Sequence, residues 1–143
     1  MIVENIFEDK IFPELKKYVE EKSIYKPTVT KAMPQQSKVF PIVPVKLLPV
    51  TNKYNNLSYG EETYTFGIEI NVYSMASGKT SKRTVCNEVT KHAIDYFKNN
   101  YHVTIKTELD ALNTDSNVHR NIVKITGKLD TKYGLDNLVI YPN

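Results

Sequence analysis

The sequence predicts a single α+β domain over residues 1–143, in which a mostly antiparallel β-sheet carries two α-helices packed on one face. Two segments place apolar residues at helical spacing, and a long segment between them alternates apolar with polar residues. Alternation indicates strands with one buried and one wetter face, which favours an antiparallel sheet covered on one side only. We find no internal repeat and no second domain.

The first helix is predicted from the apolar residues between Ile2 and Val19, which fall near helical spacing while charged residues occupy the positions between them. Pro13 either lies in the first turn of a second short helix or kinks one long helix. The helix should end before Pro27, because the residue before a proline is pushed towards extended conformations.

Two short strands should follow this helix. Thr28 to Met33 forms the first, and the second lies in an apolar segment that contains Pro41, Pro44 and Pro49. Proline is confined to sheet edges, strand starts and bulges, and Pro44 has the opposite parity to the other two prolines. We therefore predict an edge strand from about Val45 to Leu48, with Pro44 at a bulge or at the strand's start.

The middle of the chain combines a loop with the clearest strand pattern. Thr51 to Gly60 is rich in Asn, Ser and Gly, which predicts a mobile loop. From Tyr64 to Tyr73, aromatic and branched residues alternate with polar residues and glycine, which predicts a long strand with one buried face.

The rest of the chain repeats the sequence of helix and strands. Ser77–Ser81 should be a turn, followed by a helix that ends at about Asn99 and has Thr80 or Ser81 as its N-cap. Further strands are expected over 101–105, 123–129 and 138–141, with a polar loop over 110–117 and a turn over 132–136.

Composition excludes several classes of protein. The formal net charge of +3, with both signs scattered along the chain, is too small to predict nucleic acid as the partner. The single cysteine, Cys86, excludes an internal disulfide and a zinc site made of cysteines. The N-terminus lacks the pattern of a signal peptide, and no apolar segment approaches the roughly 20 residues that cross a bilayer.

Short motifs do not predict catalysis or cofactor binding. Ser77-Gly-Lys-Thr80 ends like a phosphate-binding loop, but Tyr73 stands where such a loop needs glycine. Asn113, Asp115 and Asn117 have the spacing of a calcium loop, yet Val118 and Lys124 occupy the positions of its required glycine and glutamate. Side chains that bond to their own backbone explain these residues better.

The three histidines lack the spacing of a metal-binding helix, and no serine or cysteine lies in a nucleophile elbow. A nucleophile–His–Asp set remains possible in space. Cys86 on the second helix is expected to be a small buried residue. We therefore expect no catalytic residues, no cofactor and no metal.

The order of elements resembles the tail terminator proteins of tailed bacteriophages and prophages. The resemblance rests on Phe40-Pro-Ile-Val43, on the strand Tyr64-Thr-Phe-Gly-Ile-Glu-Ile-Asn-Val-Tyr-Ser74, on the Ser-Gly-Lys turn with its helix, and on Asp115-Ser-Asn-Val-His-Arg120 before Thr126-Gly-Lys-Leu-Asp130. His119 stands where the family often has an aromatic residue before arginine.

The resemblance implies a homo-oligomeric ring, usually of six subunits, that caps the finished tail tube and offers a docking surface to the head or neck protein. DNA would pass through the ring without sequence-specific binding, and the protein would be made in the host cytoplasm and reside in the virion. No catalytic residues are implied.

Partner contacts are expected on the two polar loops, since loops on a rigid scaffold carry function. The candidate contact residues are Asn52, Tyr54, Asn55, Leu57, Tyr59, Asp115, Asn117, His119 and Arg120. Another neck or head-completion protein is the nearest alternative. A small nucleic-acid-binding protein, with Lys79 to Arg83 on the phosphates, is the alternative from a different class, and an enzyme comes third.

Overall fold

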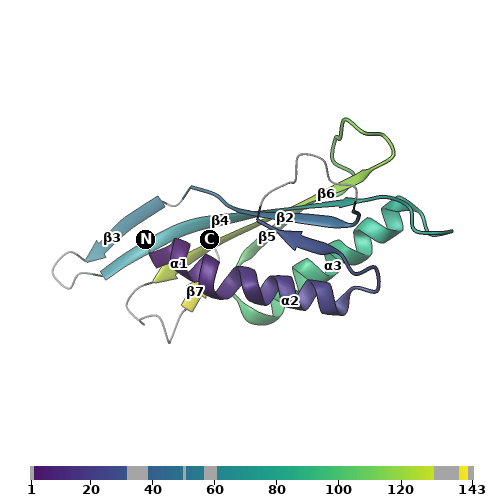
Figure 1. The fold of residues 1–143 in the computed structure, drawn as a ribbon. Coiled ribbons are helices and arrows are strands. Elements are labelled where there is room, and N and C mark those ends of the chain that lie inside the picture. The colour runs from purple at the N-terminus through teal and green to yellow at the C-terminus, as the bar shows by residue number, and fades with distance from the viewer. Residues whose placement is uncertain (1, 32–38, 50, 57–60, 131–138, 142–143) are drawn as a thin grey trace.

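The computed structural model describes residues 2–31, 39–49, 51–56, 61–130 and 139–141. It contains a seven-stranded sheet whose continuous path runs β1 (Thr28–Thr30), β2 (Ile42–Leu47), β4 (Glu61–Ser74), β6 (His119–Asp130) and β5 (Thr104–Glu108). β3 (Thr51–Asn56) pairs with the first part of β4, and β7 (Val139–Tyr141) pairs with the last part of β6. The β1–β2 pair is parallel and the other pairs are antiparallel (Figure 1).

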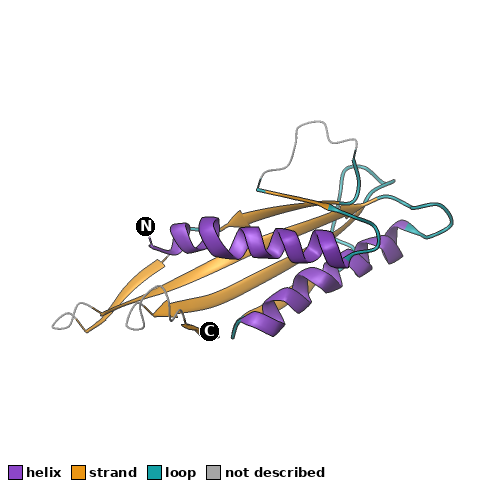
Figure 2. Ribbon diagram, turned by 60° about the horizontal axis from the view of Figure 1, so that its bottom comes forward, coloured by secondary structure: helices purple, strands orange, loops and turns teal. Residues whose placement is uncertain are grey.

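The helical layer lies on one face of this sheet, as Figure 2 shows. It consists of α1 (Ile2–Ile6), a π-helical turn η1 (Phe7–Ile11), α2 (Phe12–Lys22) and the long helix α3 (Lys82–Asn100). The predicted α+β class is therefore confirmed. None of the helices in the described part of the chain has the length and apolar character that a bilayer-spanning helix needs.

Pro13 follows the first of the two predicted alternatives. It lies in the first turn of α2, directly after the π-helical turn. The π-helical turn just before it joins α1 to α2, so the chain remains helical from Ile2 to Lys22.

The core forms between the helices and the inward face of β4 and β6. The residues of β4 predicted to face inward are all buried: Tyr64, Phe66, Ile68, Ile70 and Val72. They share one cluster with α2 through Leu15 and Val19 and with α3 through Val89, Ala93 and Phe97. The strand parity read from the sequence is confirmed.

The predicted edge strand near Val45 begins three residues earlier, and among the described residues only the added part, Ile42 to Pro44, has a further strand beside it, while Val45 to Leu47 form an edge as predicted. β1 covers Ile42 to Pro44 on one side and β4 lies on the other. Pro44 lies inside β2, and the pairing with β4 skips Val43 and Pro44 without a change of register. A proline inside the strand is tolerated because it removes only one donor from a ladder that resumes at Val45.

The predicted mobile loop over Thr51–Gly60 is wrong for its first six residues, which form β3. Asn52 and Tyr54 pair with β4, and Asn55 lies at a shift of register between Tyr54 and Asn56. Asparagine has a low intrinsic preference for strands, but β4 offers the backbone a complete set of partners. Leu57 and Tyr59 fall outside the described residues.

The strand predicted over 101–105 begins three residues later, as β5, because Tyr101 follows directly on the last turn of α3; the other remaining predictions hold where the structure describes them. Ser81 caps α3, since its Oγ accepts from the N–H of Thr84 at 3.2 Å. Ser77 and Thr80 bond to each other through their backbones, with Gly78 at φ 57°, which makes this segment a tight turn. β1 is shorter than the predicted strand over 28–33, and the predicted turn over 132–136 lies outside the described residues.

Candidate functional site

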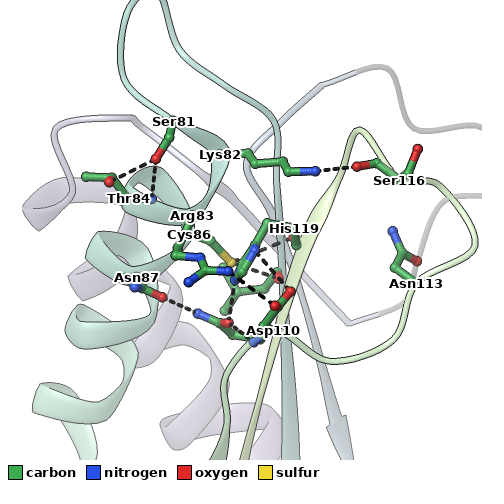
Figure 3. A network of polar contacts seen from close by, with 12 residues as sticks. Ser81, Lys82, Arg83, Thr84, Cys86, Asn87, Asp110, Asn113, Ser116 and His119 are labelled. Carbon is green, nitrogen blue, oxygen red and sulfur yellow. Dashed lines mark hydrogen bonds and ion pairs between the residues drawn. The ribbon is translucent and has the colours of Figure 1, made fainter.

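The loop between β5 and β6, residues 109–118, is held against the first turns of α3 by a network of polar contacts (Figure 3). Asn121 on β6 is its centre and is fully buried. Its Nδ2 donates to Asn87 Oδ1 at 2.9 Å and to Thr90 Oγ1 at 3.0 Å, while its Oδ1 accepts from the N–H of Asp110 at 3.0 Å. One amide therefore joins β6, α3 and the loop.

His119 extends this network towards the surface. Its Nε2 lies 3.1 Å from Asn121 Oδ1, and its Nδ1 lies 3.5 Å from an Asp110 carboxylate oxygen. Asp110 in turn pairs with Arg83 on α3 at 3.3 Å. Because His119 is only 4% exposed, it positions the loop and has almost no surface to offer a partner. This corrects its selection as a contact residue.

Arg120, the next residue, lies on the opposite face of the sheet. Its Nε and Nη2 donate to Asn71 Oδ1 at 3.0 and 2.8 Å, and its guanidinium lies 5.6 Å from the centre of the Tyr73 ring. Its Nη1 donates to the carbonyl of Leu112 at 3.0 Å. Arg120 therefore clamps the backbone of the loop to the uncovered face of the sheet.

Asp115 and Asn117 stabilise the loop from within, as the turn-chemistry interpretation predicts. The Asp115 carboxylate accepts from the N–H of Asn117 at 2.9 Å, and its carbonyl accepts from the N–H of Val118 at 3.2 Å. Lys82 on α3 donates to the carbonyl of Ser116. The loop is thus fixed at several points, yet it leaves the side chain of Leu112 92% exposed.

The described part of the chain holds no group of three or more side chains that could bind a metal ion. Cys86 is buried, and its burial raises the pKa of the thiol from 9.0 to about 11. A thiol in this environment is a poor nucleophile at neutral pH.

Ser23, Glu88 and His92 form the one close serine–carboxylate–histidine set that we find among the described residues. Ser23 Oγ donates to Glu88 Oε2 at 2.6 Å, and His92 Nε2 lies 2.7 Å from Glu88 Oε1. The carboxylate stands between the other two groups, so the imidazole cannot take the serine proton as in a catalytic triad. The set instead ties the end of α2 to α3.

The other predicted contact segment lies at the far end of the sheet. β3 and the start of β4 form a hairpin that extends beyond the helical layer, whereas the 109–118 loop lies at the opposite end of β4 and β6 (Figure 1). The structure therefore separates the two predicted contact segments by the length of the sheet. Sequence reasoning missed the network around Asn121, because the strand was predicted to begin at residue 123; extending the alternation of Val123 and Ile125 by two residues places Asn121 on the buried face.

No protein-family model matches this chain, and no curated protein is significantly similar to it.

Proposed function

We propose that this chain is a structural subunit of a phage or prophage tail. It forms a ring that caps the tail tube, ends tail elongation and provides the surface on which the head docks. One support is the order of elements on which the resemblance rests: a helix, a proline-bearing strand, a long alternating strand, the Ser-Gly-Lys turn with its helix, and a closing strand.

The observation that carries the proposal is the position of the exposed apolar side chains. Leu109 and Leu112, 57% and 92% exposed, lie at the end of β5 and in the loop that follows it. Ile24 and Met75, 74% and 41% exposed, line a hollow on the other side of β4, near β1 and β2. Exposed apolar side chains that lie next to one another, as Leu109 and Leu112 do along the chain, are the kind of surface that meets a partner.

The two patches differ from each other and lie at the same end of the sheet, one beside the β1–β2 strands and one beside β5, and such unlike patches suit a head-to-tail contact between identical subunits. Such a contact joins the Leu112 side of one copy to the Ile24 side of the next, and it closes into a ring when the rotation per subunit divides a full turn. An isologous dimer would need only one self-complementary patch.

The fixed loop also favours association. Arg120, Asn121 and Lys82 hold its backbone before any partner arrives. Ordering a loop on binding opposes association, so a loop that is already ordered lowers this cost.

Light scattering over a range of concentrations, with and without the tail tube protein of the same particle, tests the proposal. We expect one closed species, with six subunits if the resemblance extends that far, whose population rises when tubes are added. A chain that stays monomeric at about 1 mM and ignores assembled tubes would rule it out. Binding to a head-side protein but not to the tube would favour the neck-protein alternative.

One observation favours the second candidate, nucleic-acid binding. The uncovered face of the sheet carries exposed lysines on three strands, at Lys46, Lys106, Lys124 and Lys128. By contrast, Lys82 and Arg83 of the predicted basic segment are engaged with Ser116 and Asp110. Fluorescence polarisation with duplex DNA would detect this activity as an affinity that falls steeply with salt.

A further inference from the structure

The two lateral edges of the sheet differ in a way that bears on what can join them. At the β1 edge, the backbone N–H and C=O of Val29 point away from β2 and are bonded by side chains of α2. Glu20 accepts from the Val29 N–H, and Lys16 donates to the Val29 carbonyl, each at 2.9 Å. Lys16 and Glu20 also pair with each other at 2.6 Å. This edge is closed to a further strand, as natural sheets often require.

The β5 edge is open in the described part of the chain. The N–H of Leu48 donates to the carbonyl of Gly67. The backbone N–H and C=O groups of odd-numbered β4 residues therefore point towards β2, and those of even-numbered residues point towards β6. The registers β4–β6 and β5–β6 then point the backbones of Ile105 and Thr107 outward. No described residue bonds to these four N–H and C=O groups.

A hollow lies on each side of this edge. On the helix side, a groove of about 440 Å³ runs between α3 and β5 and is lined by Ile94, Lys91, Lys98, Asp95, Thr107 and Leu109 among others. On the uncovered face, a second hollow of about 190 Å³ is lined by Lys106, Thr107, Glu108, Ile122 and Lys124. Because side chains of a strand alternate between faces, a strand added beside β5 would place them in the two hollows in turn.

We propose that the β5 edge binds an extended segment of a partner protein, which adds to the sheet as a further strand. Main-chain hydrogen bonds to Ile105 and Thr107 supply affinity, and the two hollows select the side chains. The apolar surface of Ile94 and Leu109 suits apolar residues on the helix side. Lys106 and Lys124, opposed by Glu108, suit acidic residues on the other side.

A second copy of this chain fits the edge poorly. Its β1 edge is already occupied by Lys16 and Glu20. Its β3, Thr-Asn-Lys-Tyr-Asn-Asn, has a lysine and no acidic residue. Pairing β5 with β5 would join two strands that each carry Lys106 and Glu108, and the concentration dependence of amide protection distinguishes this case from a partner segment. The inference goes beyond the proposed ring and holds for a monomer as well.

The probe is an eight-residue peptide of alternating valine and glutamate, blocked at both ends, with a valine–lysine peptide as its counterpart. We expect the glutamate peptide to bind and to protect the amides of Ile105 and Thr107 from hydrogen exchange. N-methylation of the residues whose N–H groups bond to β5 should abolish binding. These residues are the valines if the peptide adds antiparallel to β5, and the glutamates if it adds parallel. N-methylation of the other set should leave binding intact.

The variant that tests the charges is Lys106→Glu with Lys124→Glu, at two exposed positions. This double variant should lower the affinity for the glutamate peptide about tenfold or more, and it should bind the lysine peptide more tightly than the glutamate peptide. Lys46→Glu, on the same face two strands away from β6, is the matched control and should change binding less than about twofold.

Several results would overturn the proposal. These are failure of the glutamate peptide to bind at about 1 mM, equal binding of both peptides, or tolerance of both N-methylated sets. Binding without protection of Ile105 and Thr107 would place the peptide elsewhere. Protection of these amides that rises with protein concentration alone would make a second copy the occupant.

Discussion

At the scale of single residues, Asn121 does more for the candidate surface than any residue that the sequence singles out. It is buried, and its amide bonds three elements that are distant in the chain. Buried amides are costly unless their partners are present, so the four contacts must form together. The alternation of β6 gives the face of Asn121 once the start of the strand is known, but a sequence does not show its partners, because they depend on β6 meeting α3.

His119 and Arg120 illustrate the same limit. The sequence places both in one predicted contact loop, but both begin β6, where successive side chains point to opposite faces. His119 is consequently buried under the loop and Arg120 lies on the uncovered face. Strand alternation was sufficient to separate them, but only once the start of β6 was known.

We predict that Asn121→Ala lowers the free energy of unfolding by about 2–4 kcal/mol, because it leaves buried groups on α3 and in the loop without partners. Chemical denaturation measures the loss, and hydrogen exchange should show faster exchange at Asp110. Asn117→Ala on the same loop is the control: its backbone, not its side chain, makes the bond to Asp115, so we expect a change within about 0.5 kcal/mol. Equal losses in the two variants would contradict the assigned role of Asn121.

Cys86 leads to a pH-dependent prediction. Folding raises the pKa of its thiol from 9.0 to about 11, so the folded state favours the protonated form. The corresponding stability is fully present below pH 9 and is lost as the pH rises from about 9 to about 11. Denaturation midpoints of the wild type and of Cys86→Ala should therefore converge over this range. Parallel curves would show that the thiolate is tolerated in the fold.

At the scale of elements, local pattern predicts what local residues determine. The alternation in β4 and the helical spacing in α3 are strong enough to fix both elements and their buried faces. β3 and the first half of β2 were harder, because asparagine and proline argue against strands locally. Their partners β4 and β1, which lie elsewhere in the chain, decide the outcome.

The faces of β4 can be tested with adjacent residues. Ile68→Asp places an unpaired charge at a fully buried site and should cost more than about 4 kcal/mol, enough to unfold the domain. Glu69 faces outward between Lys46 and Lys124 of the neighbouring strands. Glu69→Gln should therefore be nearly neutral, whereas Glu69→Lys should cost about 0.5–1 kcal/mol more, with the difference shrinking at high salt. Thermal unfolding measures all three, and similar midpoints for Ile68→Asp and Glu69→Gln would refute the assignment of faces.

The start of α3 supplies a second test at this scale. Ser81→Ala removes the acceptor for the Thr84 N–H and should cost about 1 kcal/mol. Ser81→Asp keeps an acceptor and adds a negative charge near the helix N-terminus, so its stability should match or exceed the wild type. Urea denaturation compares them. An alanine variant as stable as the wild type would mean that the cap contributes nothing.

At the scale of the whole molecule, the two sides of the sheet have different chemistry. The β1 side is closed by α2 along its edge and presents Ile24 and Met75, whereas the β5 side has an open edge and presents Leu112 on a fixed loop. A subunit with unlike sides has a direction. Directional subunits build rings or filaments, and the closed β1 edge prevents growth by endless strand pairing.

This direction makes a mixing experiment decisive for the ring. Leu112→Asp damages one side of the proposed contact and Ile24→Asp damages the other, and both side chains are exposed enough for the fold to persist. Each variant alone should fail to assemble where the wild type forms a closed species. In an equal mixture, the intact Leu112 patch of the Ile24→Asp variant can still bind the intact Ile24 patch of the Leu112→Asp variant. No second contact can form, so assembly should stop at a heterodimer. Analytical ultracentrifugation resolves these species. Unchanged assembly of Ile24→Asp alone would reveal an isologous contact, and rings in the mixture would show that neither patch belongs to the interface.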